Sequence, residues 1–224
     1  MAQPRILMIV TSADTMTSGK ATGLWLEEFA LPYQRFVDAG ADVTVASPKG
    51  GATPIDPRSS PDEQQELAWQ DAQERLAHTR RLSDVSAEDF DAVFLPGGHG
   101  TMFDLPDNPE LIRLLDAFAA DNKVIAAVCH GPAGLVGVTG KDGKPLVAGR
   151  RVAAFTDEEE RAVELDQDVP FLLETRLREL GAEVDAKPPF QEHALRDGRL
   201  VTGQNPPSSA RTAELTLEAL NTAG

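Results

Sequence analysis

Short apolar runs alternate with amphipathic stretches along most of the 224-residue chain. Runs that are apolar throughout are typical of strands buried on both faces of a sheet, and apolar residues three or four apart are typical of helices. The pattern predicts strands at 5–10, 42–46, 92–95, 124–128, 151–155, 183–185 and 200–202, and helices at 24–39, 109–120, 170–180 and 208–220. Strands that alternate with helices need crossover connections. We therefore predict an α/β, flavodoxin-like fold with a mostly parallel central sheet and helices on both faces.

Residues 48–90 interrupt this alternation. The segment opens with Pro48-Lys49-Gly50-Gly51, carries three further prolines, and becomes polar and helix-prone over residues 62–78. It is longer than the loops that usually join neighbouring elements. Because a chain of this length suits one α/β domain, we predict a single domain over residues 1–224. The segment is then an insertion that packs over the sheet edge or over the site.

Composition narrows the classes of function. The formal net charge is −15 at pH 7, which argues against a nucleic-acid partner, because such proteins present a basic surface. No apolar run approaches the roughly 18 residues of a membrane helix, and the first residues lack the long apolar stretch of a secretory signal. The chain has one cysteine and so no intramolecular disulfide. A free thiol in a reducing cytoplasm is therefore the expectation.

That cysteine, Cys129, directly follows the apolar run 124–128 and precedes His130-Gly131-Pro132. Small residues two positions away on either side permit a sharp turn from strand to helix that exposes the side chain, as in the nucleophile elbow of serine hydrolases. A thiol needs a base or a positive field to ionise near neutral pH. The N-terminus of the next helix and the imidazole of His130 offer both. A buried structural cysteine and a packing histidine are the alternatives.

Glu28 is a second candidate for chemistry. Its neighbours three and four positions away on the predicted helix are all apolar: Leu24, Trp25, Leu31 and Pro32. A carboxyl on such a face is buried, and burial raises its pKa and makes it a proton donor to a thiolate or a substrate oxygen. An exposed glutamate beside Glu27 is the alternative.

Two further motifs carry candidate groups. Gly97 and Gly98 follow a predicted strand, at the sheet edge where ligands of parallel sheets bind, so their N–H groups are candidate donors to an oxyanion. The run 157–160 offers carboxylates to a histidine, although acidic residues at the start of a helix commonly pair with its dipole. The remaining histidines, His78, His99 and His193, are scattered, and His99 is expected to shape its turn. One cysteine does not build a thiolate site, so we predict no metal.

Together these motifs resemble the ThiJ/PfpI superfamily, whose fold is like that of class I glutamine amidotransferases, and within it the branch of glyoxalase III and the heat-shock chaperones. The matching segments span nearly the whole chain in family order: Thr22-Gly23 with Glu28, then 95–100, 126–132, 155–160 and 200–206. The resemblance implies a Cys129–His130–Glu160 arrangement with Glu28 hydrogen-bonded to the thiol. It also implies an oxyanion hole from the N–H groups of Gly98 and His130. Glu158 and Glu159 are alternatives to Glu160.

The activity implied by the resemblance is that of a glutathione-independent glyoxalase. Such an enzyme converts methylglyoxal or a similar 2-oxoaldehyde to the 2-hydroxy acid through a hemithioacetal on Cys129, without cofactor or metal, commonly as a homodimer. A holdase chaperone, a deglycase-type repair protein, a cysteine peptidase and a redox sensor based on oxidation of Cys129 remain alternatives. A class I amidotransferase is disfavoured, because that family needs a late His-x-Glu and Ala194-Leu195 follows His193.

Overall fold

A computed structural model describes residues 3–222, and within them seven strands form one sheet in the order β3-β2-β1-β4-β5-β9-β8. Every neighbouring pair is parallel except β8 and β9. The predicted α/β fold with a mostly parallel sheet is confirmed. The strands are β1 (Arg5–Ile9), β2 (Asp42–Ser47), β3 (Arg80–Arg81), β4 (Ala92–Leu95), β5 (Val124–Val128), β8 (Ala194–Asp197) and β9 (Leu200–Gly203).

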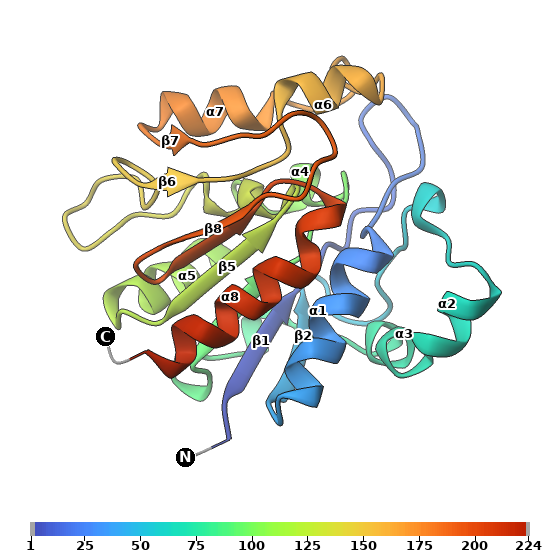
Figure 1. Cartoon of the computed structure of the whole chain (residues 1–224), viewed down its shortest axis with the longest axis horizontal. Coiled ribbons are helices and arrows are strands. Elements are labelled where there is room, and N and C mark those ends of the chain that lie inside the picture. Colours follow the sequence, from blue (N-terminus) through green and yellow to red (C-terminus); the bar gives the residue numbers. More distant parts are fainter. Residues whose placement is uncertain (1–2, 223–224) are drawn as a thin grey trace.

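Helices cover both faces of this sheet (Figure 1). Helices α1 (Leu26–Asp38) and α8 (Ser209–Asn221) lie side by side over one face, and α5 (Pro109–Ala120) packs on the other. Alternate residues of β1 serve the two cores: Ile6 and Met8 pack with α1, whereas Leu7 and Ile9 belong to the α5 side. Because successive side chains of a strand point to opposite faces, a strand covered on both faces is apolar throughout.

Shorter elements lie around the central sheet. They are α4 (Thr101–Asp104), α6 (Asp157–Ala162), α7 (Leu173–Glu179) and a separate two-stranded parallel sheet of β6 (Arg151–Val152) and β7 (Glu183–Val184). In Figure 1, α6 and α7 lie along one margin of the molecule, with β6 and β7 beneath them. Several predicted boundaries are corrected here. The strand predicted to run to residue 155 ends at Val152, and the helix predicted from residue 170 begins at Leu173.

The hairpin of β8 and β9 has only one strand that the pattern predicted. Residues 194–197 read Ala-Leu-Arg-Asp, and only Leu195 among them is buried. An edge strand with one buried side chain lacks the continuous apolar run that identifies the central strands. The antiparallel pairing is therefore a feature that only the tertiary structure reveals.

Residues 48–90 extend the sheet edge and also approach the loop before α1. The helix-prone part forms two helices, α2 (Glu63–Ala68) and α3 (Gln70–Ala77), separated by Trp69, whose backbone leaves the helical conformation. Strand β3 pairs with β2 and becomes the edge strand of the sheet, and α3 packs against α1. Ile55 pairs with Leu24, which places the following residues close to the candidate site. None of the helices within residues 3–222 is long and apolar enough to cross a membrane.

Candidate active site

Cys129 lies at a strained turn directly after β5. Its φ angle is +59°, a left-handed conformation that side chains other than glycine seldom adopt. Two hydrogen bonds hold the turn: the Cys129 N–H donates to Gly203 O (2.9 Å) and its carbonyl accepts from Phe155 N–H (3.0 Å). A Cβ atom at residue 131 would lie 2.1 Å from Leu95 O, so glycine is required there. The sharp turn predicted after the strand is present, but two parts of that prediction are corrected: a 3₁₀ turn over Gly131–Leu135 follows in place of a helix, and the Cys129 side chain is buried, not exposed.

The imidazole of His130 lies between the thiol and a carboxylate. Cys129 Sγ is 3.3 Å from His130 Nδ1, and His130 Nε2 is 2.7 Å from Glu160 Oε2. Phe155 packs on the ring, with 4.4 Å between the centroids. All four side chains are buried. A base within hydrogen-bond reach of a nucleophile and oriented by a third group is the arrangement of covalent catalysis.

The acidic run 157–160 separates into distinct roles. Glu160 contacts His130, whereas Glu158 is exposed and Glu159 turns away from the imidazole. Glu159 accepts hydrogen bonds from Thr156, Phe190 and Asn205, which account for both of its oxygens. Helical spacing explains the difference, because neighbouring positions lie about 100° apart around the axis. The alternatives at residues 158 and 159 are therefore not placed to orient the histidine.

Glu28 is fully buried on the face of α1 that packs against the sheet. Its Oε2 accepts the Gly97 N–H at 2.7 Å. Its Oε1 is buried with no hydrogen-bond partner of good geometry among the described residues. Burial raises the pKa of Glu28 to about 8, although hydrogen bonds with the Cys129 thiol and with Gly97 oppose the increase. The carboxyl is therefore largely protonated at neutral pH.

The thiol is also neutral in the resting site. Burial raises the pKa of Cys129 well above its ordinary value, and the neighbouring Glu28 carboxyl adds to this. The predicted positive field from a following helix is therefore not what ionises this thiol. Sulfur becomes a thiolate here only when its proton moves to His130, where Glu160 stabilises the resulting imidazolium.

The two glycines after β4 differ in what their N–H groups do. Gly97 binds Glu28, so its predicted role as an oxyanion donor is replaced by that of holding the carboxyl. The N–H groups of Gly98 and His130 donate to no acceptor within residues 3–222. Gly98 has a φ of +100°, and a Cβ atom there would lie 2.4 Å from backbone atoms of Gly23 and Trp25. Only glycine allows this approach of the loop to the start of α1.

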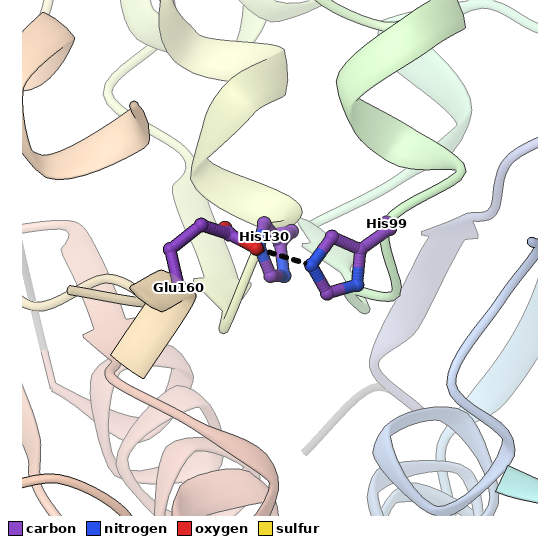
Figure 2. A group of neighbouring side chains, drawn as sticks. All are labelled: His99, His130 and Glu160. Carbon is purple, nitrogen blue, oxygen red and sulfur yellow. Dashed lines mark hydrogen bonds and ion pairs between the residues drawn. The ribbon is translucent and has the colours of Figure 1, made fainter. Parts of the chain in front are cut away.

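His99 belongs to the site, contrary to the prediction that it only shapes its turn. Its Nε2 lies 2.6 Å from Glu160 Oε1, and its ring stacks near that of His130, with 4.0 Å between centroids. Figure 2 shows the bond between the Glu160 carboxylate and His99, with the His130 ring beside the same carboxylate. Its Nδ1 lies 3.2 Å from a guanidinium nitrogen of Arg58. The sequence indicates only weakly that His99 belongs to the site, because a histidine in a glycine-rich turn often has no catalytic role.

Asp56 and Arg58 extend this chain of contacts and were not predicted. Arg58 donates to both carboxyl oxygens of Asp56, at 2.9 and 2.6 Å. Asp56 is buried and also accepts from the Thr22 hydroxyl at 3.2 Å. The other face of Arg58 lines a cavity of about 240 Å³ with Met16, Lys20 and Leu165 among its residues. Residues of the inserted segment thus connect the buried histidines to a solvent-facing cavity.

These contacts determine the tautomer of His99. A guanidinium only donates, so Nδ1 of His99 must accept and its single proton lies on Nε2, which donates to Glu160. Burial lowers the pKa of His99 to about 4, and the nearby His130 contributes, so the ring is neutral. Burial alone would raise the pKa of Glu160, but the two imidazoles hold it well below its ordinary range. The carboxylate is therefore ionised and accepts two N–H donors.

The spacing of His99, His130 and Glu160 also suits a metal ion, because their ligand atoms all lie within 4.8 Å of one another. A metal on His99 Nε2 would move the ring proton to Nδ1. That proton would then face the N–H donors of Arg58, which cannot accept it. The chemistry of the donor set therefore disfavours a metal while Arg58 is in place.

Removal of this donor is expected to create a metal site. In a Cys129→Ser background, which removes the thiolate as a competing ligand, Arg58→Met is expected to bind one Co²⁺ per chain at least about tenfold more tightly than the background alone. Visible absorption and isothermal titration measure this binding. Arg58→Lys, which still only donates, should behave like the background, and adding His99→Asn should abolish the gain. Equal affinity with and without Arg58 would contradict the tautomer assignment.

Comparison with known proteins identifies the family of the chain. Residues 20–219 match the DJ-1/PfpI family. The chain belongs to this family. The DJ-1/PfpI relatives include the glutathione-independent glyoxalase HSP31 of Saccharomyces cerevisiae, which is 31% identical over 98% of this chain and 99% of its own length.

Two solved structures are closely similar to this fold. Glyoxalase III of Candida albicans has a TM-score of 0.87 at 27% identity, over 96% of this chain and 97% of that one. The Rapid Encystment Protein 24 kDa of Francisella tularensis has a TM-score of 0.92 at 34% identity, over 98% and 100% of the two chains. Several relatives at about 30% identity over most of the chain are thus glutathione-independent glyoxalases.

Proposed function

We propose that this protein is a glutathione-independent glyoxalase that converts methylglyoxal, or a similar small 2-oxoaldehyde, to the 2-hydroxy acid, D-lactate in the case of methylglyoxal. The observation that carries the proposal is a buried carboxyl with a pKa of about 8, Glu28, next to a thiol that has its own base, His130. Isomerisation of a 2-oxoaldehyde needs these two proton-transfer groups and a nucleophile. The activity of the related glyoxalases supports the same reaction.

The first step forms a hemithioacetal. Cys129 Sγ attacks the aldehyde carbon, C1, while its proton passes to His130 Nδ1, and Glu160 stabilises the imidazolium. Negative charge develops on the aldehyde oxygen, where the N–H groups of Gly98 and His130 are candidate donors. The neutral carboxyl of Glu28 then gives its proton to that oxygen and becomes a carboxylate.

The second stage moves hydrogen from C1 to C2. The Glu28 carboxylate removes the C1 proton, and the electron pair shifts toward the C2 carbonyl, whose oxygen takes a proton from His130. The product is an enediol still bonded to sulfur. Loss of the O1 proton to His130 and return of the Glu28 proton to C2 give a thioester of the 2-hydroxy acid. C1 is oxidised and C2 is reduced, so no external oxidant or reductant is needed.

Hydrolysis completes the cycle. The Glu28 carboxylate accepts a proton from the attacking water, the C1–S bond breaks, and the imidazolium of His130 returns a proton to sulfur. The acid leaves, and thiol, imidazole and carboxyl regain their starting protonation. Each proton transfer by a positioned side chain contributes on the order of a hundred- to ten-thousand-fold in rate.

The other functions considered have less support. A holdase needs exposed apolar surface, and the large apolar side chains exposed within residues 3–222 lie on separate segments: Val37, Leu67 and Phe190. A peptidase needs access for a polypeptide, whereas Cys129, His130 and Glu28 are each at most 3% exposed. A small aldehyde is the substrate that suits a buried thiol.

The test is formation of D-lactate from free methylglyoxal in a buffer without glutathione, other thiols or amines. We expect turnover that needs no added metal or cofactor. The stereospecific product is measured with D-lactate dehydrogenase, and a parallel reaction starts from methylglyoxal already bound to a lysine peptide. Turnover of the peptide adduct with none of the free aldehyde would replace the glyoxalase proposal with a repair activity. No product from either substrate would overturn both.

A further inference from the structure

A second cavity lies near the amino ends of strands β5 and β9, whereas Cys129 follows the carboxyl end of β5. Its volume is about 470 Å³, and three segments far apart in the sequence line it: 119–125, 140–150 and 199–200. Ile125 of β5 and Leu200 of β9 belong to its lining, and both are near the starts of their strands, whereas Cys129 follows the end of β5. In Figure 1 this region lies at the side of the molecule where α5 ends and the β8–β9 hairpin turns.

The lining of this cavity is strongly basic in an acidic protein. Its lining includes one carboxylate, that of Asp142. It also includes five cationic side chains: Lys123, Lys141, Lys144, Arg150 and Arg199. These are five of the 21 lysines and arginines in a chain of net charge −15. Positive charge is therefore concentrated at this cavity in a chain whose net charge is negative.

Hydrogen bonds to backbone carbonyls use only part of the donor capacity of these cations. Lys123 donates to Ala87 O at 2.7 Å, and Arg150 and Arg199 donate to the carbonyls of Asp197 and Ala219. Each such bond uses one N–H of a group that has three or five, and a carbonyl carries only partial charge. Among these five cations the one ion pair within residues 3–222 is Lys144 with Asp142, at a long 3.7 Å. The positive charge is otherwise uncompensated.

The floor of the cavity is apolar. Ile125, Leu146 and Leu200 contribute to it, and each is at most 7% exposed. A cavity of several hundred Å³ has the size of a small-molecule site, and this one combines apolar side chains with several converging cations. A ligand that suits both parts has an apolar body and a group with at least two negative charges.

We propose that this cavity binds a small organic phosphate. Arginine and lysine together favour phosphate, because the guanidinium pairs with two oxygens and the ammonium adds a point charge. A long nucleic acid is disfavoured by the net charge of the chain. The site is independent of the Cys129 chemistry and of the activity proposed above.

The experiment titrates the protein with phenyl phosphate by isothermal calorimetry at low salt, with pyrophosphate and benzyl alcohol as probes of the charge and of the apolar body. We expect one phenyl phosphate per chain, weaker pyrophosphate binding and no benzyl alcohol binding. Lys141→Gln/Lys144→Gln, which changes two exposed side chains, and Arg199→Gln should each weaken phenyl phosphate at least about tenfold. The double variant should retain D-lactate formation at the wild-type rate.

The matched control removes the same charge elsewhere. Arg113→Gln/Arg211→Gln changes two cations that lie outside the cavity and pair with glutamates. Its affinity for phenyl phosphate should stay within about twofold of wild type. Equal losses in the control and in the cavity variants would show general charge attraction and overturn the proposal, as would the absence of any phosphate binding by the wild type. If pyrophosphate binds tightly and phenyl phosphate does not, the site binds an inorganic ligand. The proposal that the apolar side chains contact an organic ligand is then wrong.

Discussion

Cys129→Ser is expected to lower kcat/KM for methylglyoxal by at least about a thousandfold, which corresponds to about 4 kcal/mol of transition-state stabilisation. The hydroxyl has nearly the shape of the thiol, so the elbow and its hydrogen bonds to Gly203 and Phe155 remain. It is a far weaker nucleophile, and His130 cannot ionise it as readily, so formation of the covalent adduct fails.

D-lactate formation over a range of substrate concentrations measures this loss. Thermal denaturation serves as the control, since an unchanged midpoint shows that the variant is folded. Mass spectrometry adds a second readout: wild type incubated with substrate should carry an adduct at residue 129, and the serine variant should not. Activity within about tenfold of wild type in a folded Cys129→Ser variant would remove this thiol from the mechanism.

Glu28→Gln is expected to lower kcat/KM by at least about a hundredfold while leaving the fold intact. The amide oxygen still accepts the Gly97 N–H, which wild type binds at 2.7 Å. The amide can neither donate nor accept a proton in the reaction. The variant therefore lacks the group that removes the proton from C1 and returns it to C2. The hemithioacetal is still expected to form, because Cys129 is unchanged and the His130 imidazolium can give its proton to the aldehyde oxygen in place of Glu28. The variant should therefore be labelled by substrate but release little D-lactate.

The pH dependence separates this role from a packing role. If the free enzyme needs protonated Glu28, kcat/KM of wild type should fall above pH 8, because the pKa of the carboxyl is about 8. The residual activity of Glu28→Gln should lack this fall. A variant that retains both the wild-type rate and the alkaline limb would exclude Glu28 from proton transfer.

Stability gives a second, independent readout of the same carboxyl. Its pKa in the folded state, about 8, is above the 4.5 of an exposed glutamate, so the folded protein holds a proton that the unfolded chain releases. The contribution of this bound proton to the free energy of unfolding is fully present below pH 4.5 and is lost as the pH rises to 8. Between pH 4.5 and 8 the free energy of unfolding of wild type, measured by urea denaturation, should fall relative to that of Glu28→Gln. The difference should change by at most about 5 kcal/mol over this range, at about 1.4 kcal/mol per pH unit.

Local sequence determined the fold class and the core of the site. Strands β4 and β5 were predicted with the bounds observed, because a strand buried on both faces admits only apolar residues. The candidate nucleophile was predicted from a thiol at the end of such a strand with glycine at residue 131, and the burial of Glu28 from the spacing of its apolar neighbours along α1. These features depend on residues within one turn or one strand. The assignment of Glu160 needed the family resemblance as well.

Only the tertiary structure decided the surroundings of the imidazole. Arg58 lies 41 residues from His99 in the sequence, and His99 lies 61 from Glu160, so no periodicity or spacing relates them. The contact between Arg58 and His99 depends on the part of residues 48–90 that pairs with Leu24 beside the site. Likewise, Gly97 donates to a carboxyl 69 residues away. A side chain's protonation and its hydrogen-bond partners are set by burial and by neighbours in space. The chain therefore specifies which groups exist by local pattern, and the packed fold specifies what each one does.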